Sequence, residues 1–118
     1  MNSKKYNWYK VSDSESEIKL RENGIGVVEV NGKIICMTKF EGDWFAFAHA
    51  CPHAGAPLSE GCIDAKGNVI CAFHNYKFNI KNGRIANYEG YFLKTYPTEL
   101  RPDGVFVGFK REGLLSWL

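Results

Sequence analysis

Short apolar runs separated by turn residues recur along the chain, and this pattern predicts strands. Residues 27–30 and 33–40 are two such runs, with Asn31-Gly32 between them. That dipeptide suits a two-residue hairpin turn, because both positions need a positive φ that asparagine and glycine tolerate best. We expect an antiparallel hairpin here, followed by a third strand over the apolar residues 44–48.

The pattern resumes after a loop in the middle of the chain. Proline and glycine interrupt residues 49–61, which predicts irregular structure. Residues 69–71 form another short apolar run. Beyond them Tyr76, Phe78 and Ile80 alternate with polar residues, which is typical of a strand with one buried face.

The end of the chain predicts one more hairpin, and a segment near its start predicts the one helix. Residues 92–101 and 105–110 flank a Pro-Asp-Gly turn and are expected to pair. Residues 14–21 have a faint helical pattern, in which Ser14 and Glu17 have the spacing of a capping box.

Length and composition favour a single all-β domain. The chain has 118 residues, of which 45% are hydrophobic and 14% aromatic. A chain of this size can bury roughly two-thirds of its unfolded surface and has no room for a second domain of ordinary size. We therefore expect one domain over residues 1–118.

The charge balance excludes two classes of partner. Fifteen basic and 13 acidic residues give a net charge of +2, which is too small for a nucleic-acid groove or an anionic membrane surface. We find no long uncharged apolar run and no export segment. A cytoplasmic protein is expected, in which the four cysteines stay reduced.

Candidate metal ligands are concentrated in one stretch. Cys51 and His53 form a C-x-H pair, and Cys71 and His74 form a C-x-x-H pair that begins after 17 intervening residues. Each pair offers one sulfur and one nitrogen donor, so two such loops brought together would supply four ligands to a metal centre. Tetrahedral zinc is an alternative on this chemistry, although zinc fingers favour Cys-x-x-Cys with two histidines.

The segment 50–78, ACPHAGAPLSEGCIDAKGNVICAFHNYKF, resembles the cluster-binding region of Rieske 2Fe-2S proteins. The match includes the C-P-H-x-G-x-P-L sequence, the ligand spacing and the S-E-G step towards the second pair. The resemblance implies a Rieske-type antiparallel β-sandwich or barrel with a two-loop cluster-binding subdomain over about residues 44–80. It also implies one 2Fe-2S cluster.

In this family two cysteines hold one iron and two histidines hold the other. The resemblance therefore implies that Cys51 and Cys71 bind the inner iron, while His53 and His74 bind the outer iron near solvent.

The same resemblance implies an electron carrier with no catalytic site and no small-molecule substrate of its own. Its expected partners are a flavin-dependent reductase and a terminal oxygenase-type enzyme. An oxygenase would need a separate iron held by two histidines and a carboxylate, and only His49 is left unassigned. The alternatives are the small subunit of a nitrite reductase-like complex and a zinc-stabilised binding module.

Four positions depart from high-potential Rieske proteins. Ala56 and Phe73 stand where those proteins have a disulfide, so we expect no such link. Tyr76 and Phe78 stand where those proteins place Ser and Tyr hydroxyls that stabilise the reduced cluster. Phe78 has no hydroxyl, and Tyr76 is longer than serine and can point into the core. A potential towards the bottom of the roughly −150 to +300 mV Rieske range is expected.

Two further departures concern the backbone around the cluster. Asn75 stands where the family usually has glycine, and asparagine is the next most tolerant residue if a left-handed conformation is needed there. Residues 87–90 match the third loop that covers the cluster in relatives.

The remaining chemistry-bearing residues are expected to be structural. Cys36 is predicted to be a small buried hydrophobe, Cys62 a half-buried thiol, and His49 a local structural contact. Pro52, Pro57 and Phe73, beside the ligands, are expected to exclude water and hold the geometry of the site. Four basic residues are expected to form a solvated strand face: Lys77, Lys81, Arg84 and Lys94.

Overall fold

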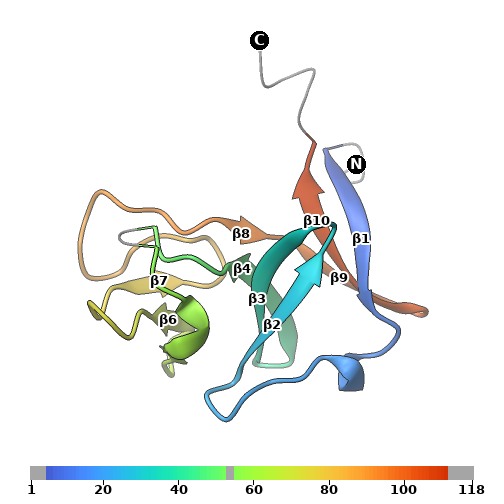
Figure 1. The fold of residues 1–118 in the computed structure, drawn as a ribbon, viewed down its shortest axis with the longest axis horizontal. Helices are drawn as coiled ribbons and strands as arrows, with labels where there is room; N and C mark the ends of the chain where they lie inside the picture. Colours follow the sequence, from blue (N-terminus) through green and yellow to red (C-terminus); the bar gives the residue numbers. More distant parts are fainter. Residues whose placement is uncertain (1–4, 53–54, 112–118) are drawn as a thin grey trace.

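The computed structural model describes residues 5–52 and 55–111, which form an almost entirely β fold with antiparallel sheets (Figure 1). The expected all-β class is confirmed. The strands are β1 (Tyr6–Ser12), β2 (Ile25–Val30), β3 (Lys33–Phe40), β4 (Asp43–Ala48), β5 (Cys62–Ile63), β6 (Asn68–Ile70), β7 (Lys77–Asn79), β8 (Thr95–Tyr96), β9 (Thr98–Arg101) and β10 (Gly104–Lys110). Two 3-10 helices accompany them, η2 (Glu15–Glu17) and η3 (Leu58–Glu60).

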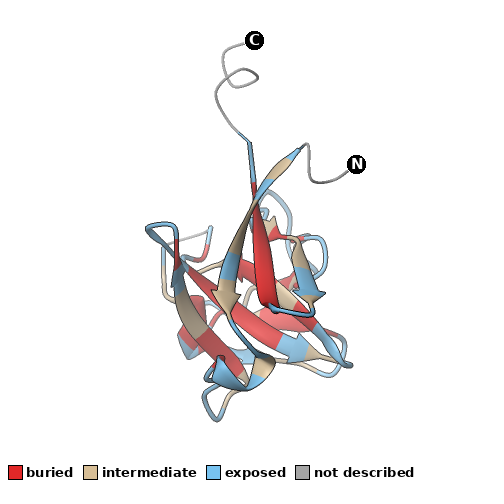
Figure 2. Cartoon of the chain, turned by 90° about the vertical axis from the view of Figure 1, so that its right-hand side faces the viewer, coloured by how far each residue is buried: buried red, intermediate tan, exposed pale blue. Residues whose placement is uncertain are grey.

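Two of the three sheets enclose the first hydrophobic core. One has the strand order β2-β3-β4-β8, and the other has the order β1-β10-β9. Figure 2 shows the buried stretches of the strands in red. The buried members of this core are Ile18, Val30, Ile35, Met37, Trp44, Ala46, Tyr96, Val105, Val107 and Phe109.

The four-stranded sheet is buried on both faces. Ile35 and Met37 on β3 belong to the first core, whereas Cys36 between them belongs to a second core. On β4, Ala46 and Phe47 are divided between the two cores in the same way. Burial on both faces explains why these strands are continuous apolar runs in the sequence.

The third sheet, β5-β6-β7, is formed between β4 and β8 in the chain and lies to one side of the other two sheets (Figure 1). Val69 and Phe78 from this sheet are fully buried in the second core. The predicted alternation is confirmed, since Phe78 and Ile80 are buried while Lys77 and Asn79 are partly exposed. The second core thus joins the third sheet to the back of β3 and β4.

The predicted hairpins are confirmed. Asn31 and Gly32 have φ values of 50° and 80°, and Val30 pairs with Lys33 across them. The last hairpin is closed by the pair Arg101 and Gly104 at the predicted turn.

The structure corrects the predicted strand over residues 92–101. Tyr96 ends β8, which pairs with β4, whereas Thr98 begins β9, which pairs with β10. Pro97 lies between them and has no N–H for either ladder, so the chain changes sheets at this residue.

The start of the chain differs from prediction in two ways. Strand β1 was not predicted, because a bulge between Lys10 and Ser12 interrupts its alternation and none of its residues is fully buried. The predicted helix over 14–21 is only the single turn η2. Ser14 makes no side-chain capping bond, and the Glu17 carboxylate accepts a hydrogen bond from the Asp13 N–H instead.

Within the described residues, none of the helices has the length and apolar character needed to cross a membrane.

Candidate metal centre

The two predicted ligand pairs lie on two loops with related backbones. We call residues 51–56 the first ligand loop and residues 71–76 the second. In the first, the Cys51 N–H donates to the Ala56 carbonyl at 2.8 Å, and the Gly55 N–H donates back to the Cys51 carbonyl at 2.8 Å. The cysteine therefore stands at the closed end of a tight turn.

The second ligand loop has the same two hydrogen bonds at the equivalent positions. The Cys71 N–H donates to the Tyr76 carbonyl at 2.9 Å, and the Asn75 N–H donates to the Cys71 carbonyl at 2.9 Å. Asn75 has a φ of 57°, and the equivalent Gly55 has a φ of 73°. Asparagine therefore does supply the left-handed conformation at this position, as the sequence indicated.

Both cysteines are buried at the same place. Cys51 is 2% exposed and Cys71 is 0% exposed, and both belong to the second core together with Leu58 and Phe78. His74 is exposed in the middle of the second ligand loop. Two sulfur donors in an apolar interior and an imidazole towards solvent suit a cluster with mixed ligation.

His53 lies outside the described residues. Within the described part of the chain, no group of three or more Cys, His, Asp or Glu side chains gathers to hold a metal ion. Of the four predicted donors, the structure therefore describes three: Cys51, Cys71 and His74. The two cysteines lie in the same core.

An aromatic group surrounds the second ligand loop. The Tyr76 ring stacks on His74 at 6.0 Å between centroids and on Tyr91 at 5.6 Å, and it meets Tyr88 edge-on at 4.6 Å. Tyr76 is partly buried against the second core, so the expected inward position is only partly correct. Burial first, and then the neighbouring Tyr91, Tyr88 and Cys51, raise the pKa of the Tyr76 hydroxyl.

The first ligand loop is tied to distant parts of the chain through η3. The Asn23 amide donates to the carbonyls of Ser59 and Gly61 at 2.7 and 2.9 Å. His49 Nε2 lies 3.0 Å from the Ser59 hydroxyl, which gives His49 the local structural contact predicted for it. Glu60 at the end of η3 also forms an exposed ion pair with Arg21.

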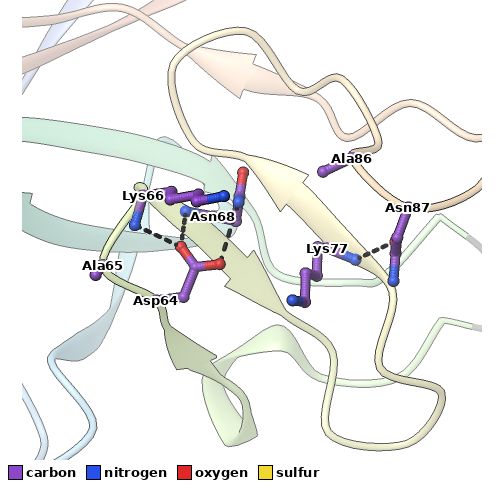
Figure 3. Close-up of a pocket in the computed structure, with 7 residues that line it drawn as sticks. All are labelled: Asp64, Ala65, Lys66, Asn68, Lys77, Ala86 and Asn87. Atoms are coloured by element: carbon purple, nitrogen blue, oxygen red, sulfur yellow. Dashed lines mark hydrogen bonds between the residues drawn. The ribbon is translucent and has the colours of Figure 1, made fainter.

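The second ligand loop is tied to the third loop through one side chain. Asn87 Oδ1 accepts a hydrogen bond from the Lys77 N–H at 3.0 Å, and its Nδ2 donates to the Asn75 carbonyl at 2.9 Å. Figure 3 shows the bond between Asn87 and Lys77 as a dashed line. The sequence placed Asn87 in the third loop but predicted neither its hydrogen bonds nor those of Asn23, because a single asparagine in a polar loop carries no sequence pattern that identifies a distant partner.

A surface hollow of about 410 Å³ lies beside this contact (Figure 3). The Asp64 carboxylate at its edge accepts hydrogen bonds from the backbone N–H groups of Lys66 and Asn68 and from the Asn68 amide. These local bonds form a turn between β5 and β6.

Two predictions on the remaining residues are confirmed or corrected. Cys36 is fully buried as predicted, and burial raises the pKa of its thiol to about 12. Cys62 is exposed on β5, so the prediction of a half-buried thiol is wrong. Pro52 and Phe73 are also exposed, so neither closes the site against water within this chain alone.

Comparison with known proteins gives relatives of two kinds. The human protein "Apoptosis-inducing factor 3" is 31% identical over 99 residues, which are 82% of this chain but only 16% of that protein. The ferredoxin component of the alkene monooxygenase system of Xanthobacter autotrophicus is 27% identical over 89 residues, covering 75% of this chain and 73% of that protein. The second relative is thus similar in length to this chain.

Solved structures share the fold. The putative NADH-dependent nitrite reductase small subunit of Mycobacterium tuberculosis has a TM-score of 0.77 at 17% identity, covering 91% of this chain and 98% of that one. The ferredoxin of carbazole 1,9a-dioxygenase from Nocardioides aromaticivorans has a TM-score of 0.70 at 17% identity, covering 86% and 96%.

The family model that matches is the Rieske [2Fe-2S] domain, over residues 7–97. Proteins of this family carry a 2Fe-2S cluster, which agrees with the buried thiols and outer imidazole found on the two loops. The match spans well over half of the chain and contains both ligand loops, so this protein belongs to the Rieske [2Fe-2S] domain family.

Proposed function

We propose that this protein is a ferredoxin that carries single electrons from a flavin-dependent reductase to a terminal oxygenase-type enzyme. The observation that carries the proposal is the pair of matched ligand loops, each with a buried cysteine, next to an exposed His74. Relatives of similar length are named as ferredoxin components of an alkene monooxygenase system and of a 3-phenylpropionate/cinnamic acid dioxygenase.

We assign Cys51 and Cys71 to one iron and His53 and His74 to the other. When bound, the cluster supplies a site that takes up and releases one electron at a time. The two cysteine thiols are shielded from water, because Cys51 and Cys71 lie in the second core with Leu58 and other apolar residues. His74 points to the surface, where a partner can approach its ring closely.

The surface beside His74 is suited to an apolar contact with that partner. Large exposed hydrophobic side chains are otherwise scattered over the described chain, but four aromatic ones lie on the second ligand loop and the segment after it. Aromatic residues are enriched where proteins meet, since they bury a large area with few rotatable bonds. The four residues are Phe73, Tyr88, Tyr91 and Phe92.

The second core supports the expected low potential. Phe78 is fully buried in the same core as both cysteines and has no hydroxyl to donate to a cluster or cysteine sulfur. A redox titration of the holoprotein should give a midpoint towards the bottom of the roughly −150 to +300 mV range of Rieske centres. A clearly positive midpoint would contradict the argument from Phe78.

A second candidate is the small subunit of an assimilatory nitrite reductase. The fold match to a putative subunit of that kind covers nearly all of both chains and therefore favours it. Co-purification of the protein from its own cells with a large reductase subunit would support this candidate over a diffusing carrier. Either role is proposed to take place in the cytoplasm.

Anaerobic purification followed by dithionite reduction tests the electron-carrier proposal. A rhombic low-temperature electron paramagnetic resonance signal, with equal iron and sulfide, would support mixed cysteine and histidine ligation. A colourless protein that contains stoichiometric zinc after iron-replete expression would overturn it. His53→Cys and His74→Cys then test the histidines, since an added thiolate charge should lower the midpoint or eliminate the cluster.

A further inference from the structure

The third loop meets the second ligand loop in the manner of a neighbouring strand. The Ala86 N–H donates to the Lys77 carbonyl at 2.7 Å, and the Asn87 side chain then bonds the Lys77 N–H and the Asn75 carbonyl. The Asn87 side-chain amide therefore hydrogen-bonds the Lys77 N–H and the Asn75 carbonyl, which flank Tyr76, as the backbone of a paired strand would.

The residue bracketed by these bonds closes the second ligand loop. The Tyr76 carbonyl accepts the hydrogen bond of the Cys71 N–H, and the Tyr76 ring stacks on His74. Tyr88, which follows Asn87 in the chain, packs edge-on against the same ring. The backbone and the side chain of Tyr76 are thus both held from the third loop.

The hydrogen bonds of Asn87 lie outside the hydrophobic cores. Asn75 and Asn87 are both exposed, and Asn87 belongs to no core cluster among the described residues. The described segment between β7 and β8 contains no strand, and the buried Leu93, whose N–H donates to the Gly83 carbonyl, fixes its far end, whereas residues 86–92 are exposed. Removal of the amide should therefore release the loop locally and leave the sheets folded.

We propose that Asn87 is a positioning residue that keeps the third loop closed on the second ligand loop and thereby slows loss of the cluster. This inference rests on the proposed assignment of Cys71 and His74 as ligands. The amide makes two hydrogen bonds that no smaller side chain reproduces, so loss of the cluster should become roughly five- to thirty-fold faster without it.

The test compares the holoprotein with three variants. Asn87→Ala removes both bonds, whereas Asn87→Asp keeps the acceptor for the Lys77 N–H and loses the donor to the Asn75 carbonyl. Asn82→Ala is the matched control, because Asn82 is an exposed asparagine nearby whose side chain bonds only the local Arg84 N–H among the bonds described. Decay of the visible absorbance in excess chelator measures cluster loss.

Hydrogen–deuterium exchange gives the second readout. We expect Asn87→Ala to speed exchange in peptides covering residues 71–78 and to leave residues 27–38 unchanged, with fast cluster loss in Asn87→Ala and intermediate loss in Asn87→Asp. Cluster loss within twofold of Asn82→Ala, or faster exchange spread evenly over both segments, would overturn the proposal.

The two readouts also separate this inference from the proposed function. If the purified protein holds zinc and no iron, the electron-carrier proposal fails by the metal assay. The exchange comparison between residues 71–78 and 27–38 still decides whether Asn87 closes the second ligand loop, because it does not depend on which metal is bound.

Discussion

The first and second ligand loops have the same backbone pattern but are attached to different parts of the molecule. The first is followed by η3, which Asn23 fixes from a segment 36 and 38 residues earlier in the chain. The second is held by Asn87, which lies only 10 and 12 residues later. The segment after the first ligand loop is thus bound to the residues just before β2, whereas the second ligand loop is bound to the third loop.

The two anchoring asparagines also differ in burial, since Asn23 is partly buried and Asn87 is exposed. Asn23 is partly buried and precedes β2, so η3 can move only if contacts with the main sheets break. Residues 72–75 of the second ligand loop and the third loop beside them are exposed and can open without disturbing those sheets. A partner that contacts His74 would therefore meet an exposed part of the second ligand loop, which exposed hydrogen bonds join to the third loop.

The largest expected effect is complete loss of the cluster when either buried cysteine, the feature common to both loops, is replaced. Cys51→Ser and Cys71→Ser should each abolish the cluster, because each removes a buried thiolate that the remaining loop cannot replace. Visible absorbance and iron content should fall to the background of the apoprotein in both variants. Cys62→Ser is the control and should keep its iron, since Cys62 is exposed on β5. Retention of a full cluster by either ligand variant would remove that cysteine from the site.

The next effect should distinguish the loops by global stability. Asn23→Ala removes two donated hydrogen bonds and the acceptor for the Ile25 N–H, all partly buried, so we expect a loss of roughly 2–3 kcal/mol in the free energy of unfolding. Asn87→Ala should cost less, about 1–2 kcal/mol, because its two bonds are exposed. Urea unfolding measures both. Equal losses in the two variants would mean that the loops are anchored alike.

The sequence predicted the common features of the loops better than their anchors. Adjacent residues carry the Asn31-Gly32 hairpin and the left-handed Asn75, so local chemistry was sufficient for these. The contacts of Asn23 and Asn87 depend on how distant segments meet, which no local pattern encodes. Cys62 was misplaced for the same reason, because exposure on a two-residue strand depends on what packs over it.

A smaller effect should be equal in the two loops. Gly55 and Asn75 occupy matched positions with φ values of 73° and 57°. Alanine tolerates this region poorly, so Gly55→Ala and Asn75→Ala should each cost about 1 kcal/mol in the free energy of unfolding. No heavy atom lies within 4 Å of a Cβ added at Gly55, so backbone strain is the main cause there. Gly55→Asn should recover most of the loss if the two positions are equivalent, and thermal or urea unfolding would show whether it does.

The smallest expected effect concerns the ion pair beside the first ligand loop. Arg21 and Glu60 are 3.0 Å apart, but their side chains are 51% and 58% exposed. Water and salt screen such a pair, so Arg21→Ala should cost no more than about 0.5 kcal/mol, and less in 1 M salt. Urea unfolding at low and high salt measures the difference. A loss of unfolding free energy as large as that of Asn23→Ala would mean that the ion pair, and not the partly buried amide, fixes η3 to the segment before β2.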